Sequence, residues 1–210
     1  MPRTRILMAD DHTLLLEGYR RLLQEEFDVI GAATDGRELL EMAKASEPEL
    51  VLMDLSMPKL NGIDATRRLA SLLPNTKVLM VSMHDDPDYV VESLRAGAVG
   101  FVLKRAGWEE LLEAIHKVLA GEIYVTPLIA GQAMELLRKS RQPGIEETLT
   151  LRQREVLQLV AEGRTAQEIA GTLKISVKTV EFHKARIMQQ LGLHTVAGLT
   201  RYALRHGMLA

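Results

Sequence analysis

The first half of the chain alternates short apolar runs with longer segments in which apolar residues recur at helical spacing. Four runs lack polar residues, as expected for strands covered on both faces, and a fifth is weaker. They span residues 6–8, 51–53, 78–81, 101–103 and 28–32. The segments between them place apolar residues three or four positions apart, as at Leu15, Tyr19 and Leu22. The pattern predicts five β-α units, which right-handed connections arrange as a five-stranded, doubly wound parallel sheet.

From Thr150 onward the pattern predicts only short helices. Thr150 with Gln153, and Thr165 with Glu168, have the spacing of capping boxes, and Ser176 is placed to cap a third helix. The apolar stripe of this third helix consists of Val177, Val180, Ile187 and Leu191. A fourth helix is expected over residues 195–206. These features predict a small all-α domain of four helices that contains a helix-turn-helix.

A change in charge supports a division into two domains. Residues 1–125 carry 14 Lys and Arg against 21 Asp and Glu, whereas residues 149–210 carry nine against four. An acidic front and a basic back are expected when only the back meets nucleic acid. We therefore predict one domain over residues 1–122, a linker with a short helix over residues 123–147, and a second domain over residues 148–210.

Composition excludes several classes of site. The chain has no cysteine, so disulfides, thiolate nucleophiles and thiolate metal sites are impossible, and a reducing compartment fits. No stretch approaches the roughly 18 consecutive apolar residues of a membrane span. We expect a soluble, cytoplasmic protein without membrane contact.

Polar residues follow four of the predicted strands at their carboxyl ends. Asp10 and Asp11 follow the first strand, Asp54 the third, Ser82 the fourth and Lys104 the fifth. Groups at the carboxyl ends of strands share a crevice in an open parallel sheet, so these side chains are expected to meet. Three carboxylates would repel one another without a cation, and hard oxygen ligands suit Mg²⁺.

This pocket has the chemistry of phosphoryl transfer. A carboxylate can form an acyl phosphate, which makes Asp54 the candidate nucleophile. Mg²⁺ and Lys104 would stabilise the charge on the transferred group, and Ser82 would donate a hydrogen bond to it. Each residue alone is also common at a strand end, so the hypothesis depends on their joint spacing.

Five motifs of residues 1–122 resemble the receiver domain of two-component response regulators. They are Asp10 and Asp11; Asp54 with Met57, Pro58 and Gly62; Ser82; Gly97, Ala98 and Gly100 with Phe101; and Lys104. The resemblance implies a flavodoxin-like sheet of order 2-1-3-4-5. It also implies that Asp54 accepts phosphate from the phosphohistidine of a cognate histidine kinase. Mg²⁺ would be bound by Asp11, Asp54 and the Ser56 carbonyl, with indirect support from Asp10, while Lys104 and Ser82 would respond to the phosphorylated state.

Three further positions are implied to tune or report phosphorylation. Phe101 stands where a Tyr is often found that rotates inward on activation, although Phe101 is equally suited to fill the core. Ser56 and His84 stand two residues after Asp54 and Ser82, where side chains control access of water to the acyl phosphate. His84 also suits an exposed loop, and His12 is better explained as a helix-start residue than as a catalyst. Arg105 replaces a Pro that many receivers have after the lysine.

Residues 149–183 resemble the LuxR-type helix-turn-helix, which with the receiver gives the architecture of NarL/FixJ-type transcriptional regulators. The residues that carry this resemblance are Leu149, Thr150, Arg154, Glu155, Ile169, Ser176, Lys178 and Val180. The resemblance implies that the third helix reads double-stranded DNA. The candidate contacts are Lys178, Thr179, Glu181, Phe182, His183, Lys184, Ala185 and Arg186. Glu181 has the alternative of being a solvated helix acid.

We therefore expect a transcription factor that binds DNA as a dimer after phosphorylation and does not turn over a substrate. The fourth helix would supply the subunit contact, or would serve only the small core. A metal-dependent phosphohydrolase is a second hypothesis, but Ser56 stands where a second acid would be needed. A protein-interaction module without DNA binding is a third, because Ala166, Gln167 and Gln190 replace polar or basic residues common in the family.

Overall fold

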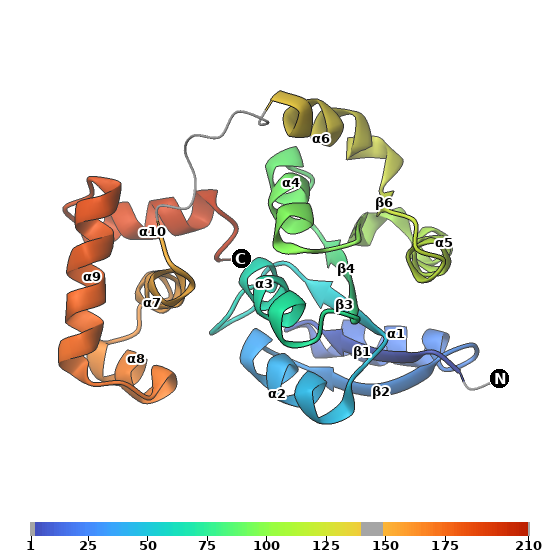
Figure 1. Ribbon diagram of the computed structural model, residues 1–210, viewed down its shortest axis with the longest axis horizontal. Helices are drawn as coiled ribbons and strands as arrows, with labels where there is room; N and C mark the ends of the chain where they lie inside the picture. The colour runs from blue at the N-terminus through green and yellow to red at the C-terminus, as the bar shows by residue number, and fades with distance from the viewer. Residues whose placement is uncertain (1–2, 140–148, 210) are drawn as a thin grey trace.

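The computed structural model describes residues 3–139 and 149–209, which form a parallel α/β domain and a bundle of short helices (Figure 1). The strands are β1 (Arg5–Ala9), β2 (Asp28–Ala33), β3 (Leu50–Asp54), β4 (Lys77–Ser82), β5 (Gly100–Leu103) and β6 (Tyr124–Val125). All strand pairs are parallel, and the order is β2-β1-β3-β4-β5-β6. This confirms the doubly wound parallel sheet and adds a sixth strand to the five predicted.

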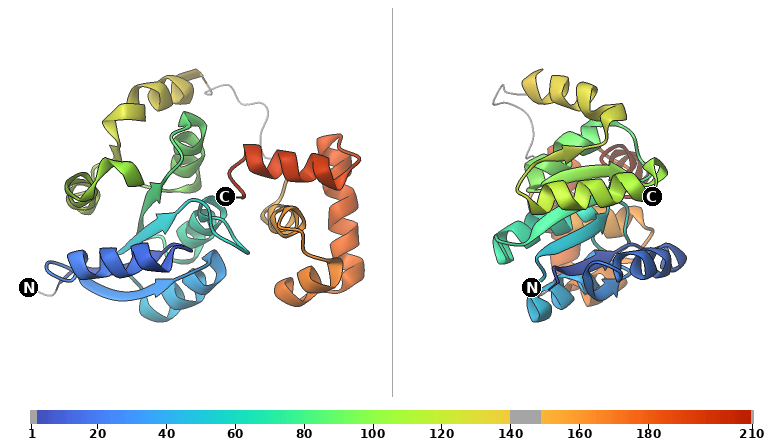
Figure 2. Two further views of the ribbon diagram at one scale, coloured as in Figure 1. Left: turned by 180° about the vertical axis from the view of Figure 1, so that it is seen from behind. Right: turned by 90° about the vertical axis from the view of Figure 1, so that its right-hand side faces the viewer.

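Five helices cover the two faces of the sheet (Figures 1 and 2). They are α1 (Thr13–Leu23), α2 (Gly36–Ser46), α3 (Gly62–Leu72), α4 (Pro87–Ala96) and α5 (Trp108–Leu119). One apolar core joins α2, α3 and α4 to the sheet, and the other joins α1 and α5 to its opposite face. Every residue of β3 is buried, which explains why that strand lacks polar alternation.

The described part of the predicted linker packs on the sheet domain. Thr126 extends the pairing of β6 with β5, because its N–H donates to the Phe101 carbonyl and its hydroxyl accepts from the Leu103 N–H. Helix α6 (Pro127–Lys139) then buries Ile129 and Ala133 in the core that contains α4. Helix α6 lies within residues 123–147, where the sequence predicts a linker with a short helix. Residues 140–147, also assigned to the linker, lie outside the described residues.

The second domain contains the four predicted helices, α7 (Leu151–Ala161), α8 (Ala166–Leu173), α9 (Val177–Leu191) and α10 (Val196–Arg205). Both predicted capping boxes form, at Thr150 and at Thr165, and Ser176 caps α9. The apolar stripe of α9 is only partly as predicted. Val180 and Ile187 are buried, but Val177 in the first turn is 42% exposed because the helix begins at the edge of the core.

The two domains contact each other through α7, while α9 lies on the side of the helical domain that faces away from the sheet (Figures 1 and 2). Several polar side chains of α7 therefore contact the sheet domain, whereas the outer face of α9 is exposed to solvent. No helix among the described residues has the length and apolar character needed to cross a membrane.

Gly62 gives a test of the close packing between β3 and α3. A Cβ at Gly62 would lie 2.0 Å from the Asp54 carbonyl oxygen, which is a backbone atom and not the movable end of a side chain. We predict that Gly62→Ala lowers the free energy of unfolding of the sheet domain by about 1–3 kcal/mol or more, measured by urea denaturation. Gly18→Ala is the matched control: nothing lies within 4 Å, so it should gain about 0.5–1 kcal/mol from helix propensity. Equal stability of the two variants would contradict the packing argument.

Candidate functional site

The carboxyl ends of the parallel strands bring four predicted side chains to one edge of the sheet. Asp54 is the last residue of β3 and Ser82 the last of β4, while Asp10 follows β1 and Lys104 follows β5 in a 3₁₀ turn. Asp10, Asp54 and Ser82 are all buried. Asp10, Asp54 and Lys104 therefore meet although they are far apart in sequence, and Ser82 ends a neighbouring strand.

Lys104 holds two buried carboxylates together. Its Nζ lies 2.6 Å from Asp10 Oδ2 and 3.1 Å from Asp54 Oδ1, and all three side chains are at most 6% exposed. Asp54 Oδ1 also accepts a hydrogen bond of 2.9 Å from the Leu55 N–H. Asp54 is thus fixed by one ammonium group and one backbone amide.

The surroundings of Asp54 make its ionisation difficult. Burial first, and then the negative charge of Asp10, raise the pKa of the Asp54 carboxyl to about 6, against the opposing effect of Lys104 and the Leu55 N–H. Burial alone would lower the pKa of Lys104, but Asp54 and Asp10 outweigh that effect and raise it. Lys104 therefore stays charged, and its single ammonium group is shared between Asp10 and Asp54.

Side-chain atoms that could hold a metal ion gather at the same place. Asp10, Asp11, His12 and Asp54 each offer one ligand atom, and these atoms lie within 4.8 Å of one another. His12 is the N-cap residue of α1, as expected, and its Nδ1 lies 2.9 Å from Asp11 Oδ1 and 3.1 Å from Asp10 Oδ1. Three carboxylates face one ammonium group, so the pocket carries an excess of negative charge that suits a divalent cation.

Two of the predicted tuning residues contact each other. The Ser56 hydroxyl lies 3.1 Å from His84 Nε2, and the His84 N–H donates to the Ser82 hydroxyl oxygen over 3.1 Å. His84 is half-buried and packs edge-on against the Tyr89 ring, with ring centres 5.2 Å apart. The structure therefore does not place His84 in an exposed loop. Residue spacing gave no signal for this pairing, because it depends on how two separate loops fold.

Two aromatic residues lie beside or beneath the pocket. Phe101 is fully buried in the core formed with α2, α3 and α4. Tyr19 of α1, which the sequence analysis includes only in an apolar helix face, lies close enough to the pocket for Lys104, Asp10 and Asp54 to affect its pKa. Burial mainly raises the pKa of Tyr19, and Lys104 opposes that effect.

Helix α9 presents most of the predicted DNA contacts to solvent. The exposed side chains are Lys178, Glu181, Phe182, Ala185 and Arg186, and the half-buried ones are Thr179, His183 and Lys184. Arg186 lies over the Phe182 ring, 5.5 Å from its centre, and Phe182 is 56% exposed. An exposed aromatic ring with a cation over it is a favourable surface for a nucleic acid.

Gln190, one of the positions where the chain departs from the helix-turn-helix family, has a structural role here. Its Oε1 accepts a hydrogen bond from Gln153 Nε2, which ties α9 to α7. The position therefore helps to hold the recognition helix in place.

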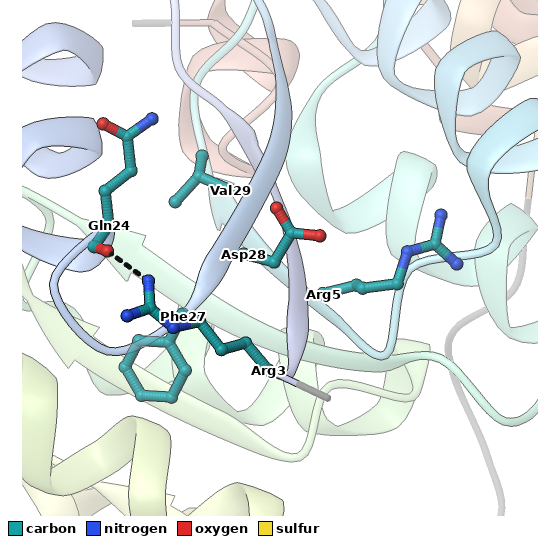
Figure 3. Close-up of a pocket in the computed structure, with 6 residues that line it drawn as sticks. All are labelled: Arg3, Arg5, Gln24, Phe27, Asp28 and Val29. Atoms are coloured by element: carbon teal, nitrogen blue, oxygen red, sulfur yellow. Dashed lines mark hydrogen bonds between the residues drawn. The ribbon is translucent and has the colours of Figure 1, made fainter. Parts of the chain in front are cut away.

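A second hollow lies at the opposite end of the sheet, where β1 and β2 begin (Figure 3). Its arginines serve the fold: Arg3 Nη1 donates to the Gln24 carbonyl over 2.9 Å, and Arg5 donates to the Ser46 carbonyl. We assign no site to it.

The sheet, the pocket and the exposed helix together define a class of protein: a receiver domain joined to a DNA-binding helix-turn-helix. Residues 6–116 match the family described as "Response regulator receiver domain", and residues 147–203 match "Bacterial regulatory proteins, luxR family". The chain belongs to the DNA-binding response regulators with a LuxR-type helix-turn-helix.

Relatives of the same architecture match over the whole chain. Oxygen regulatory protein NreC of Staphylococcus aureus is 40% identical over 98% of this chain and 99% of its own length. Transcriptional regulatory protein MctR of Rhizobium johnstonii is 37% identical over 100% and 97%. Among solved structures, RcsB of Salmonella enterica serovar Typhimurium, bound to a promoter with the phosphomimetic BeF₃⁻, is 25% identical with a TM-score of 0.61 over 95% and 97%.

Asp10 offers a test of the electrostatics of the pocket. We predict that Asp10→Asn lowers the pKa of Asp54 below about 6, because removal of a neighbouring negative charge favours the ionised carboxylate and leaves Lys104 to Asp54 alone. The measurement is a pH titration of the ¹³C-labelled Asp54 carboxyl by NMR in metal-free buffer. Asp28→Asn, at the other end of the sheet, is the control. An unchanged Asp54 titration in Asp10→Asn would show that burial alone sets it.

Proposed function

We propose that the chain accepts a phosphoryl group on Asp54 from the phosphohistidine of a partner kinase and then binds DNA as a dimer to regulate transcription. The observation that carries this proposal is the buried Asp54, Asp10 and Lys104 cluster on the same chain as an exposed basic recognition helix. A solved structure of the similar protein RcsB holds that protein on a promoter in the presence of the phosphomimetic BeF₃⁻, which supports a link between phosphorylation and DNA binding.

The phosphoryl step needs little from the protein beyond position and charge. A carboxylate oxygen of Asp54 forms the new P–O bond, the P–N bond of the phosphohistidine breaks, and the leaving imidazole keeps the bonding electrons and takes a proton. Lys104, already 3.1 Å from Asp54 Oδ1, stabilises the negative charge of the transferred group. The Ser82 hydroxyl, buried at the end of the neighbouring strand, would donate a hydrogen bond to it.

The donor set fits Mg²⁺. Asp11, Asp54 and the Ser56 carbonyl would hold the ion, and Asp10 would support it indirectly, since oxygen ligands and excess negative charge are what Mg²⁺ prefers. When bound, the ion supplies charge neutralisation for the phosphoryl oxygens. Asp54 would supply the nucleophile, Lys104 a positive charge and Ser82 a hydrogen-bond donor.

The output domain would act on double-stranded DNA in the cytoplasm. Lys178, Thr179, His183, Lys184 and Arg186 would contact phosphates or bases, and Glu181, Phe182 and Ala185 would face the major groove. The outer face of α10 keeps Val196 and Leu204 nearly half exposed, at 46% and 47%. This apolar surface suits a contact with a second copy of the domain.

The two alternatives are weaker for specific reasons. A phosphohydrolase would need a proton donor beside Asp54, but the Ser56 hydroxyl at that position is engaged with His84. A module without DNA binding was suggested by missing basic positions, yet the Gln190 side chain bonds α9 to α7, and the outer face of α9 remains exposed. Multiple turnovers on small phosphate esters would favour the first alternative, and absence of DNA occupancy in cells would favour the second.

Phosphorylation gives the direct test. We predict that the chain incubated with phosphoramidate and Mg²⁺ gains the mass of one phosphoryl group, because Asp54 is the buried nucleophile beside Lys104. Asp54→Asn and removal of Mg²⁺ with a chelator should each abolish the gain in intact-protein mass spectrometry. Asp28→Asn should leave it unchanged. A protein that stays unmodified, or that is modified equally in Asp54→Asn, would contradict the assignment.

Salt dependence tests the nucleic-acid surface. We predict that binding of a mixed-sequence duplex, followed by fluorescence anisotropy, weakens linearly in log K against log salt. Lys178→Gln should reduce the steepness of that line by about one, since one phosphate contact is lost. Lys44→Gln on the receiver is the matched control and should change neither value. A flat salt response would speak against the DNA assignment.

A further inference from the structure

Phe182 lies on the outer, solvent-exposed face of α9. Its side chain is 56% exposed, whereas Val180 and Ile187, on the opposite face of the helix, are buried in the core of the helical domain. Phe182 therefore contributes little to that core. A single exposed ring is common on protein surfaces and indicates no function by itself, so the argument depends on what surrounds it.

Arg186, one helical turn after Phe182, places its guanidinium over the Phe182 ring, 5.5 Å from the ring centre. Within the part of the chain that the structure describes, no carboxylate pairs with Arg186, whereas Arg152 and Arg154 of α7 are each paired with an acid. The contact with the ring uses the flat face of the guanidinium and leaves the N–H donors in its plane able to bind a ligand. Arg186 is thus held in position by an apolar ring.

Two other neighbours define the shape of this surface. His183 is half-buried and meets the Phe182 ring edge-on, with ring centres 5.8 Å apart. Ala185 is exposed on the same helix face and has only a methyl group, so it does not hinder close approach of the helix to a ligand. The ring and the guanidinium are therefore arranged in advance, and little side-chain freedom is lost when a ligand binds them.

An apolar ring beside a guanidinium matches a particular pair of groups in the major groove of DNA. The C5-methyl group of a pyrimidine is the apolar group there, and O6 and N7 of guanine are the two acceptors that fit the guanidinium fork. Phe182 and Arg186 are about 6 Å apart along the helix axis, and successive base pairs are about 3.4 Å apart. The two side chains can therefore reach groups within about two base pairs of each other.

We propose that Phe182 and Arg186 read a pyrimidine C5-methyl group and a nearby guanine in each half-site of DNA. This inference rests on the proposed function and names base groups that the assignment of α9 to DNA leaves open. Phe182 covers the methyl group and excludes water from it, while Arg186, aligned on the ring, donates to O6 and N7 of guanine. Thymine and 5-methylcytosine have the same methyl group, so methylation of a cytosine at this position raises the affinity of a site.

The first experiment finds a preferred duplex and then removes the methyl group. The full chain selects duplexes from a random-sequence pool, and fluorescence anisotropy gives the Kd for the enriched duplex. Deoxyuridine in place of the enriched thymine should weaken binding of the wild type about fourfold, as for one methyl group returned to water, and should not affect Phe182→Ala. Deoxyuridine at a thymine outside the enriched positions is the control. An enriched site without thymine within two base pairs of guanine, or an equal effect in both proteins, would overturn the proposal.

A second arm uses the other source of the methyl group. The enriched thymine–adenine pair is replaced by cytosine–guanine, with the cytosine either unmodified or methylated at C5. Methylation should recover about fourfold in the affinity of the wild type and nothing in Phe182→Ala, because only the wild type has the ring that covers the methyl group. No gain on methylation in the wild type would contradict the reading of the methyl group.

A third arm tests Arg186 with 7-deazaguanine, which lacks the N7 acceptor. In place of the enriched guanine it should weaken binding of the wild type about five- to tenfold, as for one hydrogen bond to a charged donor. Arg186→Lys keeps the charge and loses the planar fork, so it should retain the wild-type salt dependence and be insensitive to 7-deazaguanine. Equal sensitivity of the two proteins would show that Arg186 contacts only phosphate.

Phe182→Leu separates the two roles of the ring. Leucine can still cover a methyl group but offers no aromatic face to Arg186, so the variant should lose more discrimination at guanine than at the methyl group. The opposite order would show that the ring does not align Arg186. If no variant and no wild-type protein binds any duplex in a salt-dependent way, the proposed function is wrong instead, whereas salt-dependent binding that ignores both base changes sinks only this inference.

Discussion

One ammonium group held between two buried carboxylates is the interaction on which the rest of the molecule depends. Asp10 and Asp54 are forced together because the strands that carry them are adjacent and parallel, and neither can reach water freely. Lys104 makes their burial tolerable, but it offsets only part of the negative charge once Asp11 is counted. The pocket keeps an excess of negative charge that favours a further cation, and under the proposed function this imbalance would suit Asp54 to phosphoryl chemistry.

This arrangement was predictable because it depends on topology more than on detailed packing. Parallel strands in a doubly wound sheet end at a common edge, which brings Asp54 and Lys104 together and puts Ser82 at the end of the strand between them. Strand β6 escaped the same analysis because two residues cannot show a period. It is defined by what it pairs with: Thr126 completes the edge of β5, and α6 then covers α4.

Contacts between the domains could not be predicted from the sequence for a different reason. On α7, Glu155 and Gln158 occupy polar positions that helical periodicity assigns to solvent, and each is buried only because a second surface meets it. The contact between Ser56 and His84 was equally unpredictable, because these residues come from two separate loops of the sheet domain. The period of apolar residues predicts which face of a helix or strand is buried within its own domain. It does not predict which polar face will contact another surface of complementary charge.

The small domain uses different faces for its two tasks. Arg154 and Glu155 of α7 are engaged with charges of the receiver, whereas Lys178 and Arg186 of α9 face away from it toward solvent. Docking on the receiver therefore leaves the recognition helix uncovered, and DNA does not compete with the receiver for the same side chains. Under the proposed function, the receiver would act on the position of the whole helical domain. Two recognition helices engage two half-sites only when the two domains adopt a common symmetry, so the receiver would control DNA binding by setting where each domain lies.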